Sequence, residues 1–238
     1  LALLARLLWR EAVYGDVGLP LQRFAQWCLN SFQLALMAAL AATALALALA
    51  FVGRVSSGAQ WRTRALNAGT GLVSLGYAVP GAVVAVGILL PLGALQAWWP
   101  TGPATALVTG TSAGLVLAYL VRFSAVALQT LEAGYTRLPP SLDDSARMLG
   151  ASRARLLGAV HVPLLRRSLA AAMLLVFVDV MKELPATLVL RPFDSDTLAV
   201  VAYNLARDER LAEAALPSFA IVLVGLLPVL LLVRAMRR

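Results

Sequence analysis

Long uncharged stretches constrain this chain more than any other feature of its sequence. Residues 24–53 form a run of 30 residues without a charged side chain, and residues 65–121 form a run of 57. A helix that crosses a bilayer needs about 20 mostly apolar residues. Charged residues make up 13% of the 238-residue chain and hydrophobic residues 61%, which is too apolar for soluble helices with one polar face each. The sequence therefore predicts an all-α transmembrane protein and argues against a water-soluble enzyme.

Turn signals divide the apolar runs into a helical bundle of five complete spans plus an N-terminal partial span. The 57-residue run is divided at residues 98–103, because a Pro-Gly turn beside two tryptophans is typical of a membrane interface. The expected spans are residues 24–53, 80–98, 104–131, 168–190 and 214–233, and the partial span is residues 1–9. Residues 61–77 are expected at the interface. Because the chain begins at Leu1, we expect it to be part of a longer polypeptide.

The distribution of arginines predicts the sidedness of the loops. The loops at residues 54–64, 132–167 and 234–238 together carry 12 arginines, whereas the loops at residues 10–26, 98–104 and 191–213 carry 5. Positively charged loops stay in the cytoplasm. The first set and the C-terminus are therefore expected in the cytoplasm, with residues 191–213 on the periplasmic side. The net charge of +8 is explained by this bias, so the lipid bilayer is the expected partner and nucleic acid is not.

The longest cytoplasmic loop has its own helix start and stop signals. A proline pair ending at Pro140 should end the incoming helix, and Ser141 should cap a new one. Gly150 is placed to stop that helix with a left-handed residue, and Ser152 to cap a second helix that ends at Pro163. Two interpretations stay open from this pattern. The two short helices could rest on lipid headgroups, or they could dock onto a cytoplasmic protein.

The spacing in this loop resembles the EAA loop of permeases in binding-protein-dependent ABC importers. The family pattern is Glu-Ala-Ala, three residues, Gly, nine residues, and then Ile-x-Leu-Pro. The matching positions here are Asp144, Ser145, Ala146, Gly150, Val160 and Pro163. Asp replaces Glu and Ser replaces Ala at the first two positions, while Val replaces Ile and Leu near the end. The resemblance implies that the loop forms coupling helices in a groove of an ATP-hydrolysing subunit.

Further segments resemble the iron(III)-type branch of these permeases. They are residues 76–81, 179–187, 191–193 and 208–215, so the resemblance covers nearly all of residues 1–238. It implies a single permease domain of type I ABC importer architecture in the bacterial plasma (inner) membrane, as the C-terminal half of a fused permease, with ferric iron as substrate. The implied partners are an ABC ATPase dimer, a second permease half or subunit, and a periplasmic substrate-binding protein.

Residues with catalytic or ligand-binding chemistry are few in this sequence. There is one cysteine, Cys28, and one histidine, His161, so neither a Cys/His metal site nor a Cys–His nucleophile is expected. His161 is expected on the surface of the second short helix. The lone lysine, Lys182, does not lie in a phosphate-binding GxxxxGK[ST] loop. ATP is therefore expected on a partner subunit, and this chain is expected to have no catalytic residue, metal or cofactor of its own.

Three charged residues lie inside the expected span at residues 168–190. Asp179, Lys182 and Glu183 have the spacing of one helical face, and Pro185 should kink the helix beside them. Charges are costly in a bilayer and usually face a polar route, so these four residues are expected to line or gate a translocation pathway. The alternative is a purely structural Asp179–Lys182 ion pair.

Other functions stay open at this stage. The importer substrate could be thiamine, sulfate, a polyamine or a phosphonate instead of iron. An ion-coupled secondary transporter could use Asp179 and Glu183 as its coupling site, and a membrane-embedded enzyme would need turnover without a partner. A secondary transporter would leave the spacing in the cytoplasmic loop unexplained, and an enzyme would lack a His, Cys or carboxylate cluster outside residues 179–183.

Overall fold

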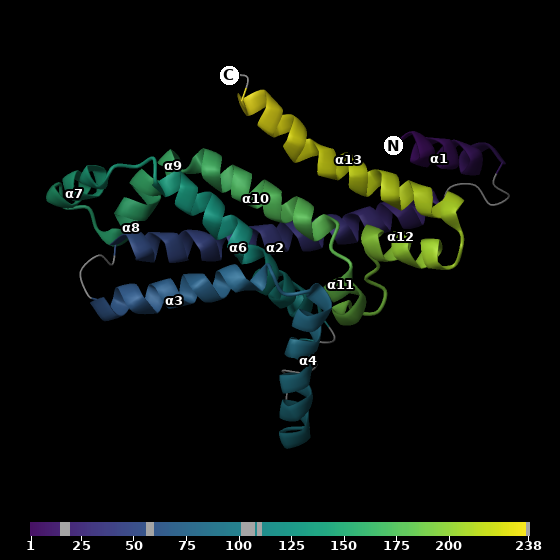
Figure 1. Cartoon of the computed structure of the whole chain (residues 1–238), viewed down its shortest axis with the longest axis horizontal. Helices are drawn as coiled ribbons and strands as arrows, with labels where there is room; N and C mark the ends of the chain where they lie inside the picture. The colour runs from purple at the N-terminus through teal and green to yellow at the C-terminus, as the bar shows by residue number, and fades with distance from the viewer. Residues whose placement is uncertain (15–19, 56–59, 101–107, 109–110, 237–238) are drawn as a thin grey trace. The chain divides into compact units, whose positions relative to one another are not determined.

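The computed structural model describes residues 1–14, 20–55, 60–100, 108 and 111–236, and these residues are helical wherever regular structure is assigned. Figure 1 shows the helices in chain order. Their bounds are α1 Ala2–Tyr14, α2 Leu21–Val55, α3 Gln60–Gly76, α4 Gly81–Trp98, α6 Ala113–Tyr135, α7 Pro140–Met148, α8 Arg153–Arg155, η1 Leu156–His161, α9 Val162–Leu164, α10 Arg166–Met181, α11 Pro185–Leu190, α12 Leu198–Arg207 and α13 Leu211–Met236.

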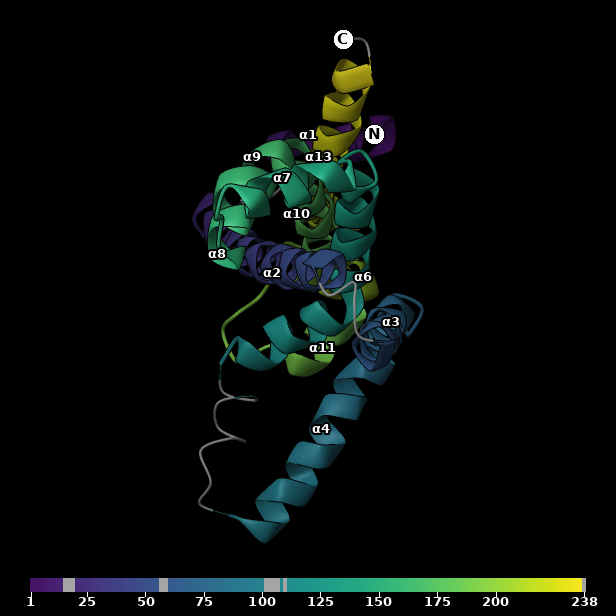
Figure 2. The same cartoon turned by 90° about the vertical axis from the view of Figure 1, so that its left-hand side faces the viewer.

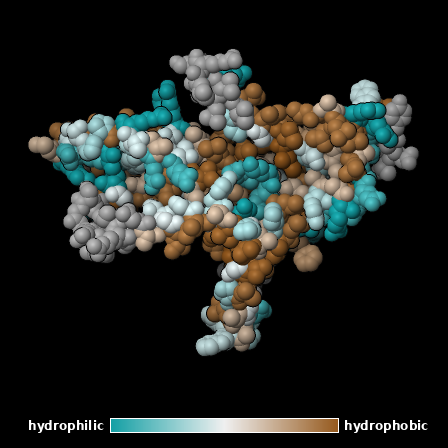
Figure 3. All heavy atoms as spheres, viewed as in Figure 1, coloured by the Kyte–Doolittle hydropathy of each residue, from teal (hydrophilic) through white to brown (hydrophobic). Residues whose placement is uncertain are grey.

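Three helices in the described part of the chain are long and apolar enough to cross a membrane. They are α2, α4 and α6. Alanine and leucine, the strongest apolar helix formers, fill most of α2. Figure 3 shows hydrophobic residues over much of α4. The predicted spans at residues 24–53 and 80–98 therefore correspond to helices, while the total of five complete spans remains a prediction.

The chain forms two compact units, each assembled from separate segments. The first contains residues 1–38, 80–118 and 177–238, and the second contains residues 39–79 and 119–176. In the first unit, α13 packs against α1 and α12, and α1 lies beside α13 in both views (Figures 1 and 2). The N-terminal turns of α4 pack against α11, where Gly81, Val84 and Ala85 are buried.

Hydrogen bonds in the first unit connect α2 to the start of α12. The Ser31 hydroxyl accepts from the Leu198 amide at 2.8 Å, and the Asn30 side chain donates to the Asp196 carbonyl at 3.1 Å. The rings of Phe32 and Phe177 meet edge to face at 5.3 Å. These contacts join segments more than 140 residues apart in the sequence.

The second unit contains a close contact between backbones at the end of α3. A methyl group on Gly76 would overlap the carbonyl oxygen of Val121 in α6. The rings of Tyr77 and Phe123 pack beside this contact at 6.5 Å. A larger residue at position 76 would separate α3 from α6, so glycine is required there by space.

The segment expected to be one kinked span is two separate helices. α10 ends at Met181, and α11 begins at Pro185. Proline has no amide hydrogen and suits the first turn of a helix, so Pro185 starts a new helix instead of bending the old one. The intervening residues 182–184 lie outside both helices.

Candidate functional site

The turn between α7 and α8 is a Schellman motif, in which a left-handed residue ends a helix. Gly150 has a φ of +78°. Its amide donates to the Arg147 carbonyl at 2.9 Å, and the Ala151 amide donates to the Ala146 carbonyl at 3.0 Å. Ser152 then caps α8 by accepting from the Arg155 amide at 3.3 Å. The predicted left-handed helix end at Gly150 and the predicted cap by Ser152 are confirmed.

The start of α7 differs from the prediction. The helix begins at Pro140, with Pro139 in the cap position and no side-chain cap, whereas Ser141 was expected to cap it. The fixed φ of proline suits the first helical position, where an amide hydrogen has no partner within the helix. Pro140 therefore starts α7 one residue before the predicted cap.

The second helix also continues past its predicted end. The helical path runs from Arg153 through Pro163 to Leu164 and includes one stretch of π-helix, η1. The Val162 amide donates to the Leu157 carbonyl five residues back. A proline clashes with the carbonyl four residues earlier in regular α-helix. The wider π turn just before Pro163 allows the helix to continue, which corrects the expectation that it ends there.

The turn exposes a small apolar tip, which we call the docking tip and define as Met148, Leu149 and Gly150. The exposed fractions of Met148 and Leu149 are 90% and 87%. Hydrophilic residues lie over much of α7 (Figure 3). Of the other coupling positions, Asp144, Ser145 and Pro163 are exposed, and Ala146 and Val160 are half-buried.

A buried polar cluster connects α7 to its neighbouring helices within the second unit. The carboxylate of Asp143 accepts from the Arg54 guanidinium Nε at 2.8 Å through Oδ2 and pairs with Nε2 of His161 at 2.9 Å through Oδ1. The other ring nitrogen of His161 lies 3.1 Å from the Tyr135 hydroxyl. Arg54 also donates to the Leu138 carbonyl at 2.8 Å. We call Arg54, Tyr135, Asp143 and His161 the buried cluster.

His161 corrects a sequence expectation. It was expected on the surface of the second short helix, yet it is 1% exposed. The rings of Phe51 and Tyr135 each pack against it edge to face at 5.3 Å. The imidazole has polar partners on both nitrogens, so its burial leaves neither of them unsatisfied. The role of His161 is therefore inside the unit and not on its surface.

The surroundings of Asp143 favour its charged form. Burial acts to raise the pKa of this carboxyl, but hydrogen bonds from Arg54 and His161, together with the charge of Arg54, outweigh it and lower the pKa below its ordinary value of 3.8. Asp143 is therefore ionised at neutral pH and forms a charge-assisted pair with Arg54.

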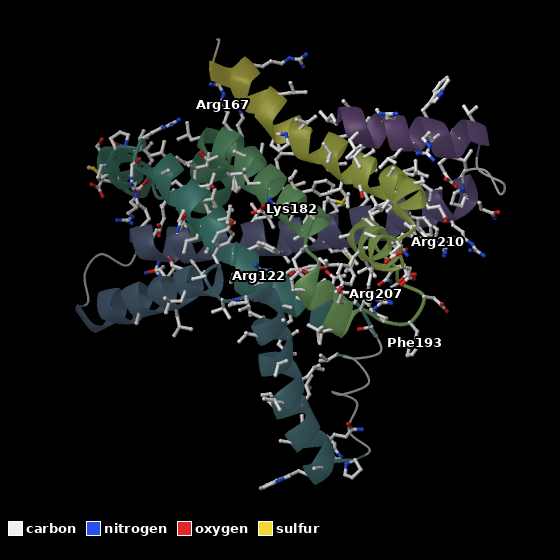
Figure 4. The ribbon with its side chains drawn as sticks, turned by 45° about the vertical axis from the view of Figure 1, so that its right-hand side comes forward. Arg122, Arg167, Lys182, Phe193, Arg207 and Arg210 are labelled. Carbon is white, nitrogen blue, oxygen red and sulfur yellow. The ribbon has the colours of Figure 1, made fainter. Side chains whose placement is uncertain are left out.

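The Asp179–Lys182 ion pair forms in the first unit as one of the alternatives expected. The Lys182 ammonium lies 2.8 Å from Oδ1 of Asp179, and the side chains are 61% and 16% exposed. Figure 4 shows Lys182 at the end of α10. The pair is local, because its members are three residues apart along the chain, and the lysine side chain is mostly exposed within this unit.

Glu183 has a different setting from the one expected. It was placed on one helical face with Asp179 and Lys182, but it follows the end of α10 and is 4% exposed. Its carboxylate accepts from the Ala186 amide at 3.1 Å, and from the Thr187 amide at 3.1 Å and hydroxyl at 2.8 Å. Glu183 therefore satisfies the first amides of α11, which the break at Pro185 leaves without helical partners.

The segment at residues 191–213 contains the short helix α12. Thr197 caps it by accepting from the Val200 amide at 3.4 Å. Asp194 has a φ of +59°, which fits a turn residue. Phe193 lies in the loop after α11 and is 100% exposed (Figure 4).

Metal-binding geometry is not found in the described part of the chain, where no three His, Cys, Asp or Glu side chains are grouped around a common point.

The sequence did not reveal the roles of Arg54 and Tyr135. Arg54 contributed to the prediction of sidedness only, and no local pattern marks Tyr135. The buried cluster is visible only once α2, α6, α7 and η1 are placed together.

Comparison with known proteins identifies membrane components of transport systems as relatives of this chain. Residues 50–238 match the family described as binding-protein-dependent transport system inner membrane component. The ABC transporter permease protein ORF1 of Streptomyces antibioticus is 34% identical over 170 residues, which cover 71% of this chain and 67% of that protein. The Fe(3+)-transport system permease protein FbpB 2 of Haemophilus influenzae is 30% identical over 118 residues, which cover 50% of this chain and 23% of that protein.

Solved structures support the fold. A bacterial alginate ABC transporter, in complex with an alginate pentasaccharide-bound periplasmic protein, matches with a TM-score of 0.65 over 87% of this chain and 76% of that chain. A second structure of an alginate-importing ABC transporter matches with a TM-score of 0.64 over 90% and 79%. Both are 15% identical to this chain, so they show a common fold and leave the substrate open.

Proposed function

The chain belongs to the family of binding-protein-dependent transport system inner membrane components, which are ABC importer permeases, and we propose that it carries ferric iron across the bacterial inner membrane. In this proposal it forms half of the translocation pathway together with a second permease half, fused or separate. A dimer of ABC ATPase subunits binds and hydrolyses ATP on the cytoplasmic side, where the C-terminus also lies. A periplasmic protein delivers the iron.

The observation that carries the proposal is the docking tip. Met148 and Leu149 are large apolar residues that are almost fully exposed beside a rigid left-handed turn. Exposed apolar residues on a rigid support are typical of a protein-binding surface. We propose that the tip inserts into a groove of the ATPase subunit, with Asp144 and Arg147 at its rim. The exposed Asp144–Arg147 pair, at 3.7 Å, can exchange partners when the subunit binds.

The residues around the break between α10 and α11 are proposed to line the pathway. Asp179 and Lys182 supply charge on one side of the break, and Pro185 supplies the interruption of the helix. Glu183 keeps the shape of the break by satisfying the first amides of α11. The lysine would prevent the acid from holding a trivalent cation tightly, because an ammonium beside a carboxylate neutralises much of its field.

Ferric iron is proposed as substrate because one relative is an iron(III) permease. Carboxylate oxygens suit a hard cation. Thiamine, sulfate, a polyamine or a phosphonate are the alternatives within the importer class.

On the periplasmic side, we propose that the loop bearing Phe193 contacts the substrate-binding protein.

Reconstitution tests this function. The chain should be co-expressed with the second permease half and the ATPase of the same system, purified, and placed in proteoliposomes with the iron-loaded binding protein. The proposal expects ATP-dependent entry of ferric iron and co-purification of the ATPase with the wild type. Replacement of both Met148 and Leu149 with serine should abolish co-purification while membrane insertion is kept. Uptake that is independent of ATP would favour an ion-coupled secondary transporter, and uptake of another solute would correct the substrate.

A further inference from the structure

We propose that the buried cluster is a rigid joint that transmits movement of the docking tip to α2 and α6, so that ATP hydrolysis and transport stay coupled. This inference rests on the proposed function and adds positioning roles for Arg54, Tyr135, Asp143 and His161. None of these four residues occupies a defined position of the motif that resembles the EAA loop, since His161 lies at its variable position. All four lie in the second unit of the chain.

The cluster connects the docking element to the ends of two helices that are long enough to span a membrane. Arg54 is the penultimate residue of α2, and Tyr135 is the last residue of α6. Asp143 lies in α7, and His161 is the last residue of η1. One side chain from each element therefore meets at a single point. A displacement of α7 has to move the end of α2 with it or break the ion pair between Arg54 and Asp143.

The two carboxylate oxygens of Asp143 start two separate series of hydrogen bonds, which we call the two routes from α7 to α2 and α6. Oδ2 accepts from Arg54 of α2, which also donates to the Leu138 carbonyl just after α6. Oδ1 pairs with His161 of η1, which in turn meets the hydroxyl of Tyr135 in α6. A neutral imidazole completes the second route when the hydroxyl of Tyr135 donates to Nδ1 and Nε2–H donates to the carboxylate. Both α2 and α6 are thus connected to α7 through one carboxylate.

Directional bonds make this a joint and not only a packing contact. Hydrogen bonds weaken steeply when their angles change, whereas apolar contacts depend mainly on buried area. The side chains of His161 and Asp143 are 1% and 7% exposed, and that of Arg54 is 18% exposed, so water competes poorly for these bonds. The cluster therefore fixes the orientation of α7 relative to α2 and α6 as well as its distance from them.

A purely stabilising role predicts something different. Replacing a buried ion pair with apolar residues of similar volume is often neutral or favourable for stability. If the pair serves only to hold the loop in place, the double variant Arg54→Met/Asp143→Leu should fold and transport normally. If the pair sets the orientation of α7, the same variant should fold and bind the ATPase but lose coupling. This contrast separates the two roles.

The experiment uses the complete reconstituted transporter with the iron-loaded binding protein and measures ATP hydrolysed per ferric ion delivered. The variants are Arg54→Met/Asp143→Leu, His161→Gln and Tyr135→Phe. The matched control is Arg137→Met, which removes an exposed arginine from the same cytoplasmic loop. We expect the double variant to raise the ratio at least about fivefold, with ATP hydrolysis retained, and the control to match the wild type. Tyr135→Phe removes one hydroxyl and should raise the ratio about twofold.

Each outcome decides the proposal. A wild-type ratio in both the double variant and His161→Gln would overturn the joint. Loss of folding or of ATPase binding in every cluster variant, including Tyr135→Phe, would also overturn it, because the role would then be structural. The proposed function fails separately, if the wild-type assembly neither binds the ATPase nor delivers iron.

Discussion

The two polar clusters of this chain use similar residues in opposite ways. In the buried cluster, Asp143 is joined to Arg54 and His161, which lie 89 and 18 residues away in the sequence. In the cluster at the break between α10 and α11, Asp179 pairs with Lys182, and Glu183 with Thr187, three and four residues away. The first cluster ties distant elements together, and the second shapes one interruption of a helix. A carboxylate in a membrane protein can thus serve tertiary structure or local backbone geometry.

The largest effect on stability is expected from Asp143→Ala. It leaves the Arg54 guanidinium and His161 without their carboxylate in a buried site, which typically costs about 3–5 kcal/mol. The comparison is with Asp144→Ala. The Asp144 side chain is 70% exposed, so this variant should change the free energy of unfolding by less than about 0.5 kcal/mol. Thermal unfolding of the purified transporter in detergent measures both. Equal midpoints for the two variants would remove the distinction between the clusters.

The pH dependence of the same variant gives the sign of the interaction. The folded pKa of Asp143 lies below its ordinary value of 3.8, so its stabilising contribution is complete above that pH and is lost as the pH falls through the folded pKa. The difference in midpoint between wild type and Asp143→Ala should therefore be constant near neutral pH and shrink below about pH 4. A difference that grows in acid would contradict the assignment.

A smaller effect is expected at the break itself from Glu183→Ala. The amides of Ala186 and Thr187 lose their acceptor inside the protein, and an unsatisfied buried donor costs about 1–3 kcal/mol. Hydrogen exchange of these two amides should accelerate, while Glu183→Gln, which keeps one acceptor oxygen, should lie between the variant and wild type. Unchanged exchange in Glu183→Ala would show that α11 does not depend on this cap.

The left-handed turn at the docking tip should respond to backbone strain alone. Gly150→Val is expected to cost about 1–2 kcal/mol, because a β-branched residue disfavours a positive φ. No neighbouring atom lies within 4 Å of an added Cβ at Gly150, so collision does not contribute. Gly150→Asn should cost less, since asparagine tolerates this conformation. Thermal midpoints in the order wild type, Asn, Val support the account, and identical midpoints contradict it.

The smallest effect is expected from Lys182→Met. The lysine is 61% exposed, and exposed ion pairs contribute less than about 1 kcal/mol. If the pair lines a pathway, uptake of ferric iron per folded transporter should change while the unfolding midpoint does not. A midpoint shift as large as that of Asp143→Ala would make the Asp179–Lys182 pair a structural element like the buried cluster.

The contrast between the clusters also explains what the sequence could predict. Gly150 and Ser152 were placed correctly because turn and cap chemistry depends on a few neighbouring residues. The interruption at Pro185 was predicted for the same reason, although its form was not. A kink was expected where the helix ends, because the sequence does not show that Glu183 satisfies the amides of the next helix.

The buried cluster could not be predicted from local patterns. In the sequence, Asp143 is one acid close to a predicted helix start, and Arg54 is one of many arginines in the loops expected in the cytoplasm. His161 was expected on the surface of the second short helix. Its partners come from α6 and α7, and only their packing creates a buried polar site for it.

Cross-linking of the docking tip to the ATPase tests the central claim most directly. A cysteine introduced by Met148→Cys, in a version that lacks Cys28, should form a cross-link with the ATPase subunit of the same system after labelling with benzophenone maleimide, whose maleimide adds the thiol and whose photoexcited ketone inserts into a C–H bond of the neighbouring protein. The matched variant Phe193→Cys is also fully exposed but lies in the segment expected on the periplasmic side, and it should form none. The account predicts a cross-linked product from Met148→Cys that changes in yield when ATP is added. A product from Phe193→Cys, or none from Met148→Cys in an assembled transporter, would contradict it.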